Sequence, residues 1–305
     1  VEKSLGIKNK KELVQKLGLR AFIEKCEKYA KSELWPMVKD FKRLGVWLNW
    51  KNPYMSIKNE YIEGAWWALA QAHKKNYLYL GKKSMTWCPR CATALAKHEL
   101  EYENIKDDSV FVKFKVKGKE NEYLVVWTTT PWTLPFNLAV MAHPEFQYVK
   151  AKIKDTGETW ILAEALAPGV IGTVAEKQYE IIDKFKGEKL KGLKYEHPFA
   201  KELPYQKEIE KLKHGHSVLM SEKYVSLDAG SGLVHTAPGC GPEDFEVGKE
   251  HGLPAYNELD EHGIFSKKMG KFAGLQAKKD DKKFIEDLDS KKLLIAITPV
   301  EHEYA

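Results

Sequence analysis

The chain has 305 residues, 43% of them hydrophobic, which is enough for one large or two ordinary domains with a real core. No apolar stretch is long enough to span a bilayer, and the first residues do not resemble a secretory signal, so we expect no membrane contact. The net charge of +6 is compatible with nucleic-acid binding but does not by itself indicate it.

Residues 1–105 are predicted to form a mostly helical connective segment. Apolar residues recur at helical spacing over Lys11–Ser32, with a break near Gly18, and again over Ile62–His73. The aromatic-rich stretch Leu44–Trp50 between them is predicted to be a loop or a short helix.

Cysteine usage indicates a reducing compartment, and we expect a cytoplasmic protein. Cys88 and Cys91 form a Cys-Pro-Arg-Cys motif, which is half of a zinc site rather than a disulfide in such a compartment. His98 is near in sequence, whereas Cys26 and Cys240 are isolated. Either no metal site exists, or its other ligands lie outside this chain.

From about residue 106 the hydrophobic period changes to two, which indicates strands. After a first strand over Val110–Val116, further short strands are predicted at Tyr123–Val126, Leu138–Ala142, Phe146–Ile153, Thr159–Ala163, Ser217–Met220, Lys223–Leu227 and Gly232–His235. This pattern predicts an α+β fold in which residues 106–290 form a barrel-like, antiparallel, β-rich domain. Residues 291–305 are predicted to form a returning connective strand.

A hydroxyl-rich stretch follows the buried strand Tyr123–Val126. It reads Trp127-Thr-Thr-Thr-Pro-Trp-Thr-Leu-Pro135, and Pro131 ends regular pairing because it lacks an N–H group. A solvent-facing threonine strand is the simpler interpretation, but the two tryptophans and two prolines favour a cluster of hydroxyls at a strand end.

A second stretch whose side chains could take part in binding or catalysis begins near Gly230. His235 and Thr236 stand at the end of a short buried strand, a Gly/Pro-rich loop follows, and Pro242 suits the first turn of a helix. Asp244 in that turn is either an ordinary helix-start acid or a carboxylate that binds an ammonium group.

The familiar catalytic motifs are absent from the sequence. There is no Gly-x-Ser-x-Gly elbow and no phosphate-binding Gly-x-x-x-x-Gly-Lys-Ser/Thr, and His235 has no partners at metal-ligand spacing. A hydroxyl-rich site with one histidine and one aspartate suits attack by water on an activated ester.

A run of lysines interleaved with apolar residues lies downstream. It comprises Lys184, Lys186, Lys189, Lys191 and Lys194. A solvated surface is the simpler interpretation, and a phosphate-contacting face is the functional alternative.

Taken together, the two polar stretches resemble the editing (CP1) insertion of isoleucyl-tRNA synthetases. Further matching segments are Leu44–Trp50, Asn59–Trp67 and Trp87–Leu95, so the resemblance covers nearly the whole chain. Thr130 stands where the valyl and leucyl enzymes carry arginine, which favours the isoleucyl family. Cys240 departs from the family pattern, which often has histidine there; it is interpreted as a small loop residue rather than a nucleophile.

The resemblance implies an activity, hydrolysis of valine from mischarged tRNA(Ile), with no cofactor for the reaction itself. His-x-Gly-His and Lys-Met-Ser-Lys-Ser are absent, so the chain resembles an insertion cut from a larger ATP-dependent ligase. The implied partners are the valine-bearing 3′ end of tRNA(Ile) and the remainder of that synthetase. A second Cys-x-x-Cys, which would complete a structural zinc site, is implied after Tyr304.

The resemblance also implies residue roles. Asp244 would hold the α-ammonium group, and Thr129 and Thr130 would place the attacking water. Thr128, Thr129 and Thr130 would together line the ester and the terminal adenosine, and Trp127 would be a wall.

The side-chain pocket would be shaped by Thr133 and His235, with His235 as the size gate against isoleucine. Two alternatives stay open at this point. One is a non-catalytic module that positions a tRNA end, and the other is an editing domain for a different small amino acid.

Overall fold

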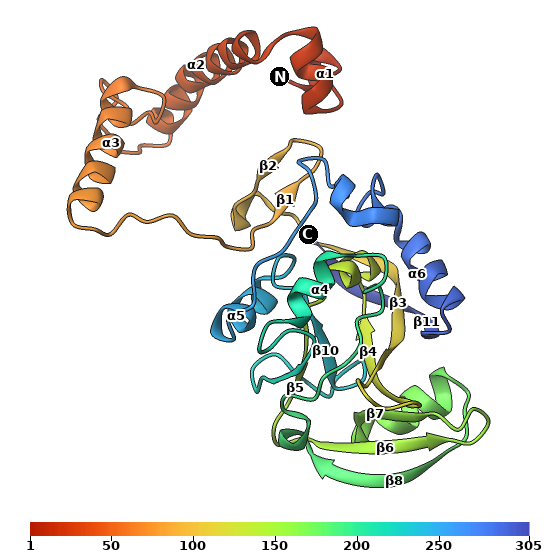
Figure 1. The fold of residues 1–305 in the computed structure, drawn as a ribbon. Coiled ribbons are helices and arrows are strands. Elements are labelled where there is room, and N and C mark those ends of the chain that lie inside the picture. The colour runs from red at the N-terminus through yellow and green to blue at the C-terminus, as the bar shows by residue number, and fades with distance from the viewer. Residues whose placement is uncertain (305) are drawn as a thin grey trace. The chain divides into compact units, whose positions relative to one another are not determined.

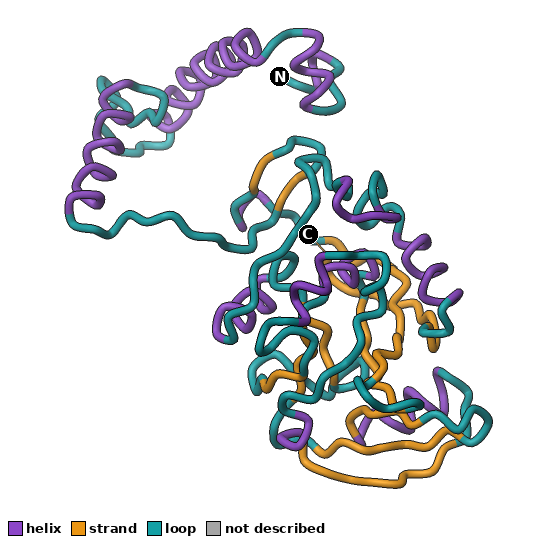
Figure 2. Tube along the Cα trace, viewed as in Figure 1, coloured by secondary structure: helices purple, strands orange, loops and turns teal. Residues whose placement is uncertain are grey.

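The structure is a computed structural model that describes residues 1–304, and it divides into two compact units. One unit comprises residues 1–82 with 90–92, and the other comprises residues 83–89 and the chain from residue 93 onward. Figure 2 shows that long helices dominate the first unit, whereas the strands lie in the second. The boundaries proposed from the sequence (1–105, 106–290 and 291–305) stay predictions.

The first unit is helical, as the periodicity predicts. It contains α1 (Lys10–Lys16), α2 (Leu19–Arg43) and α3 (Asn59–Lys74). Gly18, with a φ of +81°, separates α1 from α2, which explains the predicted break. The second helix continues past its predicted end and includes Pro36. Within residues 1–304, no helix has the length and apolar character needed to cross a membrane.

The second unit contains a small hairpin, a large sheet and short helices (Figure 1). The hairpin pairs β1 (Trp87–Cys88) with β2 (Thr93–Ala94). The sheet consists of β3 (Glu103–Lys115), β4 (Glu122–Thr128), β5 (Ala139–Ala142), β6 (Gln147–Ile153), β7 (Thr159–Ala163), β8 (Tyr179–Lys186), β9 (Val218–Met220), β10 (Leu233–Thr236) and β11 (Leu294–Tyr304). The helices are α4 (Tyr205–Glu210), α5 (Pro242–Glu250) and α6 (Asp281–Ser290).

The predicted α+β, β-rich architecture is confirmed, with two corrections. The sheet is mixed rather than antiparallel throughout, because β4 runs parallel to β7 and β10, and β5 runs parallel to β9. The strand predicted over Lys223–Leu227 does not form; the Tyr224 N–H instead donates to Ser221 Oγ (3.3 Å) in a turn. In Figure 1, β6 and β8 run across the ends of β3 and β4, so the sheet is strongly curled.

Strand β4 is the branch point of this sheet. One edge pairs antiparallel with β3 along most of its length. The other edge is shared, since residues 122–124 pair with β7 and Trp127 pairs with Val234 of β10. Leu124, Val125 and Val126 are completely buried, which accounts for the continuous apolar run in the sequence. Because β4 and β10 are parallel, their carboxyl ends meet at the same edge of the sheet.

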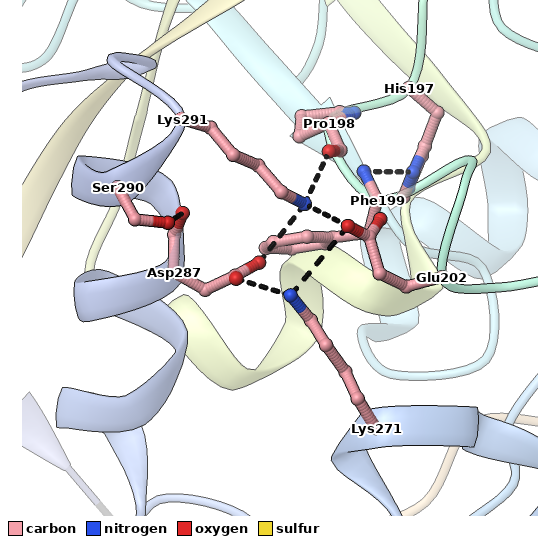
Figure 3. Close-up of polar contacts among 8 residues, drawn as sticks. All are labelled: His197, Pro198, Phe199, Glu202, Lys271, Asp287, Ser290 and Lys291. Carbon is pink, nitrogen blue, oxygen red and sulfur yellow. Dashed lines mark hydrogen bonds and ion pairs between the residues drawn. The ribbon is translucent and has the colours of Figure 1, made fainter.

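A network of two lysines and two carboxylates holds α6 against the rest of the unit (Figure 3). Lys291 Nζ lies 2.8 Å from Glu202 Oε1 and 3.0 Å from Asp287 Oδ2, and it donates to the Pro198 carbonyl (3.1 Å). Lys271 pairs with Asp287 from the other side. These groups are partly buried, so their attraction is screened less than that of surface pairs.

Candidate active site

The threonine stretch turns sharply at the end of β4. Thr128 is the last strand residue, and a 3₁₀ turn follows over Pro131–Phe136. The Thr128 Oγ1 accepts from the Thr130 N–H (3.1 Å), and the Thr133 hydroxyl donates to the Thr130 carbonyl (2.8 Å). The hydroxyls therefore fold back on the turn that carries them, which fixes their directions.

Helix α6 supports this turn from behind. Asp281, its first residue, accepts the Trp132 backbone N–H at 3.1 Å. Burial raises the pKa of Asp281 to about 6, although Lys278 opposes that shift. The ion-pair network of Figure 3 holds the other end of α6, so the position of the threonine turn depends on the packing of this helix.

A pocket of about 310 Å³ lies where β4 and β10 end. Its lining includes six of the seven catalytic and substrate-binding residues that the sequence predicts: Trp127, Thr128, Thr129, Thr130, His235 and Asp244. The seventh, Thr133, stands behind the wall and touches His235. The structure thus brings two stretches that are far apart in the sequence into one small cavity.

His235 is a neutral side chain with a hydrogen bond at each of its two ring nitrogens. Its Nδ1 faces the Asn137 amide nitrogen (3.4 Å), which can only donate, so Nε2 carries the hydrogen and donates to Thr133 Oγ1 (2.8 Å). The Asn137 Oδ1 accepts in turn from the Tyr195 hydroxyl. Burial lowers the pKa of His235 to about 4. With both nitrogens hydrogen-bonded, His235 has no free nitrogen with which to accept a proton from a ligand.

Asp244 lies in the first turn of α5, as the sequence predicts. Its Oδ2 accepts the Ala237 N–H (3.1 Å), and burial raises the pKa of its carboxyl to about 6. Among the described residues no lysine or arginine forms an ion pair with it. A Cβ at Gly241 would lie 3.0 Å from Oδ2, so this glycine leaves room for the carboxylate. The result is an acid that lacks a cation and faces a pocket.

No role in the site is predicted from the sequence for the loop that closes the pocket. Tyr224, Ser226 and residues 229–232 also line it. Gly230 has a φ of +77°, and a Cβ there would lie 2.9 Å from the Trp127 ring. The Gly-Ser-Gly spacing was the available signal, because two glycines around a small residue often mark close backbone approach.

The cysteines supply neither a nucleophile nor a complete metal site within residues 1–304. Burial raises the pKa of the Cys240 thiol, so the reactive thiolate is disfavoured. Cys88 lies on β1, and Cys91 lies in the turn that follows it. No group of three or more His, Cys, Asp or Glu side chains could hold a metal ion in the described part of the chain. The zinc site stays a prediction that requires ligands from elsewhere.

The lysine run is largely neutralised by local acids. Lys184 pairs with Glu164, Lys186 pairs with Glu145 (2.6 Å), and Lys191 pairs with Glu188 (3.1 Å). Lys194 donates to backbone carbonyls of residues 213 and 215. These pairs favour the interpretation of this run as a solvated surface rather than a phosphate-contacting face.

Comparison with known proteins identifies relatives of the whole chain. The family model of tRNA synthetases class I (I, L, M and V) matches residues 1–279. The isoleucine–tRNA ligase of Pyrococcus abyssi is 50% identical over 309 residues, which cover 100% of this chain and 29% of that protein. The Methanocaldococcus jannaschii ligase is 47% identical and is covered to 30%. The chain thus spans under a third of the length of these relatives.

Solved structures with detectable likeness are more distant in sequence. The crystal structure of GlLeuRS-CP1 is 15% identical with a TM-score of 0.47, covering 62% of this chain and 99% of that one. The editing domain of the P. falciparum cytosolic leucyl-tRNA synthetase is 10% identical with a TM-score of 0.44, covering 63% and 99%.

The raised pKa of Asp244 predicts a stability cost that depends on pH. The folded chain holds this proton more tightly than the unfolded chain, so stability falls as pH rises from about 4 to about 6 and stays lower above that. Asp244→Asn removes the charge and keeps an acceptor for the Ala237 N–H. Denaturant unfolding at pH 7.5 is expected to show the variant more stable by on the order of 1–2 kcal/mol. At pH 3.5 the two proteins are expected to match, and an equal difference at both pH values contradicts this assignment.

Proposed function

Because this chain belongs to the class I tRNA synthetases (I, L, M and V), we propose that it is the editing part of an isoleucyl enzyme, which hydrolyses valine wrongly esterified to tRNA(Ile). The observation that carries the proposal is the shared pocket, where an uncompensated carboxylate, three threonines and a neutral histidine meet.

The physical need for such a pocket follows from the size of the two amino acids. An isoleucine site cannot strongly exclude valine, because one methylene is worth only about 1–3 kcal/mol; this pair of amino acids is the well-known case of that limit. A second pocket that admits valine and excludes isoleucine can remove the wrong product. The pocket of about 310 Å³ lies at the small end of the range for ligand sites.

Each predicted residue has a task in this mechanism. Asp244 binds the α-ammonium group, since a bound cation replaces the missing counter-charge and favours the ionised carboxyl. Thr129 and Thr130 place a water against the ester carbonyl. No activated side-chain nucleophile lines the described pocket, so water attacks directly.

The remaining residues shape the cavity. Trp127 forms a wall, held by its ring N–H donating to Ser109 Oγ (3.0 Å), and Thr128 lines the ester and the terminal adenosine. His235 bounds the side-chain space, and Thr133 holds the His235 ring from behind the wall. Because Thr133 and Asn137 hold the His235 ring at both nitrogens, His235 cannot swing away to admit a larger side chain.

Two partners follow from this proposal. The 3′ end of tRNA(Ile) brings the ester, and the remainder of a cytoplasmic, ATP-dependent synthetase joins the first unit. Trp47, Trp66 and Trp67 in that unit are 95%, 67% and 67% exposed, and large exposed apolar side chains suit contact with further protein. Ligands that complete a zinc site with Cys88 and Cys91 would come from the same source.

Truncation of the acid tests the activity. Asp244→Ala removes the ammonium partner, and kcat/KM for deacylation of Val-tRNA(Ile) is expected to fall at least ~100-fold, as for other buried charge contacts. Asp228 is an exposed residue of the loop that closes the pocket. Asp228→Ala is the matched control and is expected to keep the parent rate. If Asp244→Ala deacylates as fast as the control, the role of Asp244 is wrong. Binding of tRNA without hydrolysis by the parent chain supports the non-catalytic module instead.

Shrinking the gate tests the specificity. His235→Ala enlarges the side-chain space, so hydrolysis of Ile-tRNA(Ile) is expected to rise about tenfold or more over the parent. His251→Ala, at the end of α5, controls for loss of a histidine outside the pocket. Unchanged rejection of Ile-tRNA(Ile) by a folded His235→Ala chain rules out His235 as the gate.

A further inference from the structure

The loop that closes the pocket contains buried backbone N–H groups that donate no hydrogen bond within the described chain. Ser231 is 1% exposed, Gly232 is buried, and both line the cavity. Within residues 1–304, neither the Ser231 N–H nor the Gly232 N–H has a hydrogen-bond acceptor. Buried backbone donors without acceptors are rare, because losing water without a replacement costs free energy. Such donors in a pocket wall indicate that a ligand supplies the acceptor.

The carbonyls of the same loop are firmly held. The Ser231 carbonyl accepts the Ala163 N–H of β7 (2.9 Å), and the Gly232 carbonyl accepts the Tyr148 hydroxyl (2.7 Å). All peptide bonds in the described chain are trans, so the Gly232 N–H points opposite to the Ser231 carbonyl, away from Ala163. A Cβ on Gly232 would lie 2.4 Å from the Ala163 Cβ, which packs the loop tightly on β7. The donor is therefore fixed in direction before any ligand arrives.

The threonine hydroxyls are less available for the same task. Thr133 already donates to the Thr130 carbonyl and accepts from His235. Thr128 and Thr130 face each other at 3.2 Å, and Thr128 also accepts the Thr130 N–H. Thr129 also has no hydrogen-bond partner within residues 1–304, but it is half-buried and is the residue proposed to place the water. The Ser231 and Gly232 peptide groups are thus the buried donors of the wall without a competing acceptor in the described chain.

We propose that the Gly232 N–H, supported by the Ser231 N–H, binds the ester carbonyl oxygen and stabilises the oxyanion that forms on it. This inference rests on the proposed hydrolase function. Water attacks the carbonyl carbon, and the C=O π pair moves onto oxygen beside these donors. The C=O bond then re-forms as the bond to the ribose oxygen breaks. One water proton ends on that ribose oxygen, and the other leaves with the amino acid. Donors fixed before the reaction stabilise such charge without rearranging.

A single-atom substitution tests the donor. Glycolic acid in place of Gly232 makes an ester link that lacks the N–H and keeps the side chain unchanged. It also weakens the Ser231 carbonyl as acceptor for Ala163. Lactic acid in place of Ala163 is the matched control, because it removes the same bond from its donor side.

The expected result is a loss of turnover without a loss of fold. For Val-tRNA(Ile), kcat is expected to fall ~100-fold or more in the Gly232 ester, with KM within about threefold. The Ala163 ester keeps the Gly232 N–H, the Tyr148 bond to the Gly232 carbonyl and the methyl group on which Gly232 packs, so it is expected to keep kcat within about threefold. The melting temperature of the Gly232 ester is expected to drop no further than that of the control, since its N–H bonds no protein group.

Two analogues give a readout that does not need turnover. The first analogue is the adenosine ester of the phosphonate analogue of valine, whose tetrahedral anionic phosphorus group imitates the oxyanion. The second is aminoadenosine carrying valine through an amide bond, which keeps the neutral carbonyl of the substrate. The Gly232 ester is expected to weaken phosphonate binding tenfold or more and amide binding less than threefold. Equal effects on both analogues, or an unchanged kcat, overturn this inference while the hydrolase proposal stands. If the unmodified chain neither hydrolyses Val-tRNA(Ile) nor binds either analogue, both proposals fail.

Discussion

The parallel pairing of Trp127 on β4 with Val234 on β10 is the constraint on which the site depends. It places the threonine turn and the strand that carries His235 at one edge of the sheet. Strand β4 can serve both neighbours because its first half pairs with β7 and only its end pairs with β10. The two polar stretches meet there because both strands end where the sheet divides.

The pocket combines two opposite electrostatic conditions. Behind it, Tyr195, Asn137 and His235 form a chain in which each buried polar group has a partner, so the wall is rigid and neutral. Facing it, Asp244 has a carboxyl whose charged form is disfavoured by burial, and no lysine or arginine within residues 1–304 forms an ion pair with it. A cationic ligand relieves that condition, and a neutral ligand of the same shape does not. This electrostatic condition is what the proposed binding of an amine at Asp244 rests on.

Much of the site could be predicted from the sequence, because its residues occur in two short motifs. Trp127 to Thr130 lie at the end of a recognisable buried strand, and Asp244 follows Pro242 at a recognisable helix start. The loop around Tyr224 could not be predicted, since its apolar alternation over Lys223–Leu227 imitates a strand while a side-chain bond from Ser221 turns the chain. Parallel pairing depends on contacts between residues that are far apart in the sequence, so the mixed sheet could not be predicted either. The Tyr195–Asn137–His235 chain has no local signature.

The proposed reaction requires one small cavity to hold both the amine and the side chain of the misplaced amino acid. A crystal structure of the chain with a non-hydrolysable valyl-adenosine bound would show where these two groups lie. We expect the ligand nitrogen within hydrogen-bonding distance of the Asp244 carboxylate and the isopropyl group against the His235 ring. Density for the amino acid at any other surface, with the pocket between β4 and β10 left to solvent, would rule out this site for the amino acid.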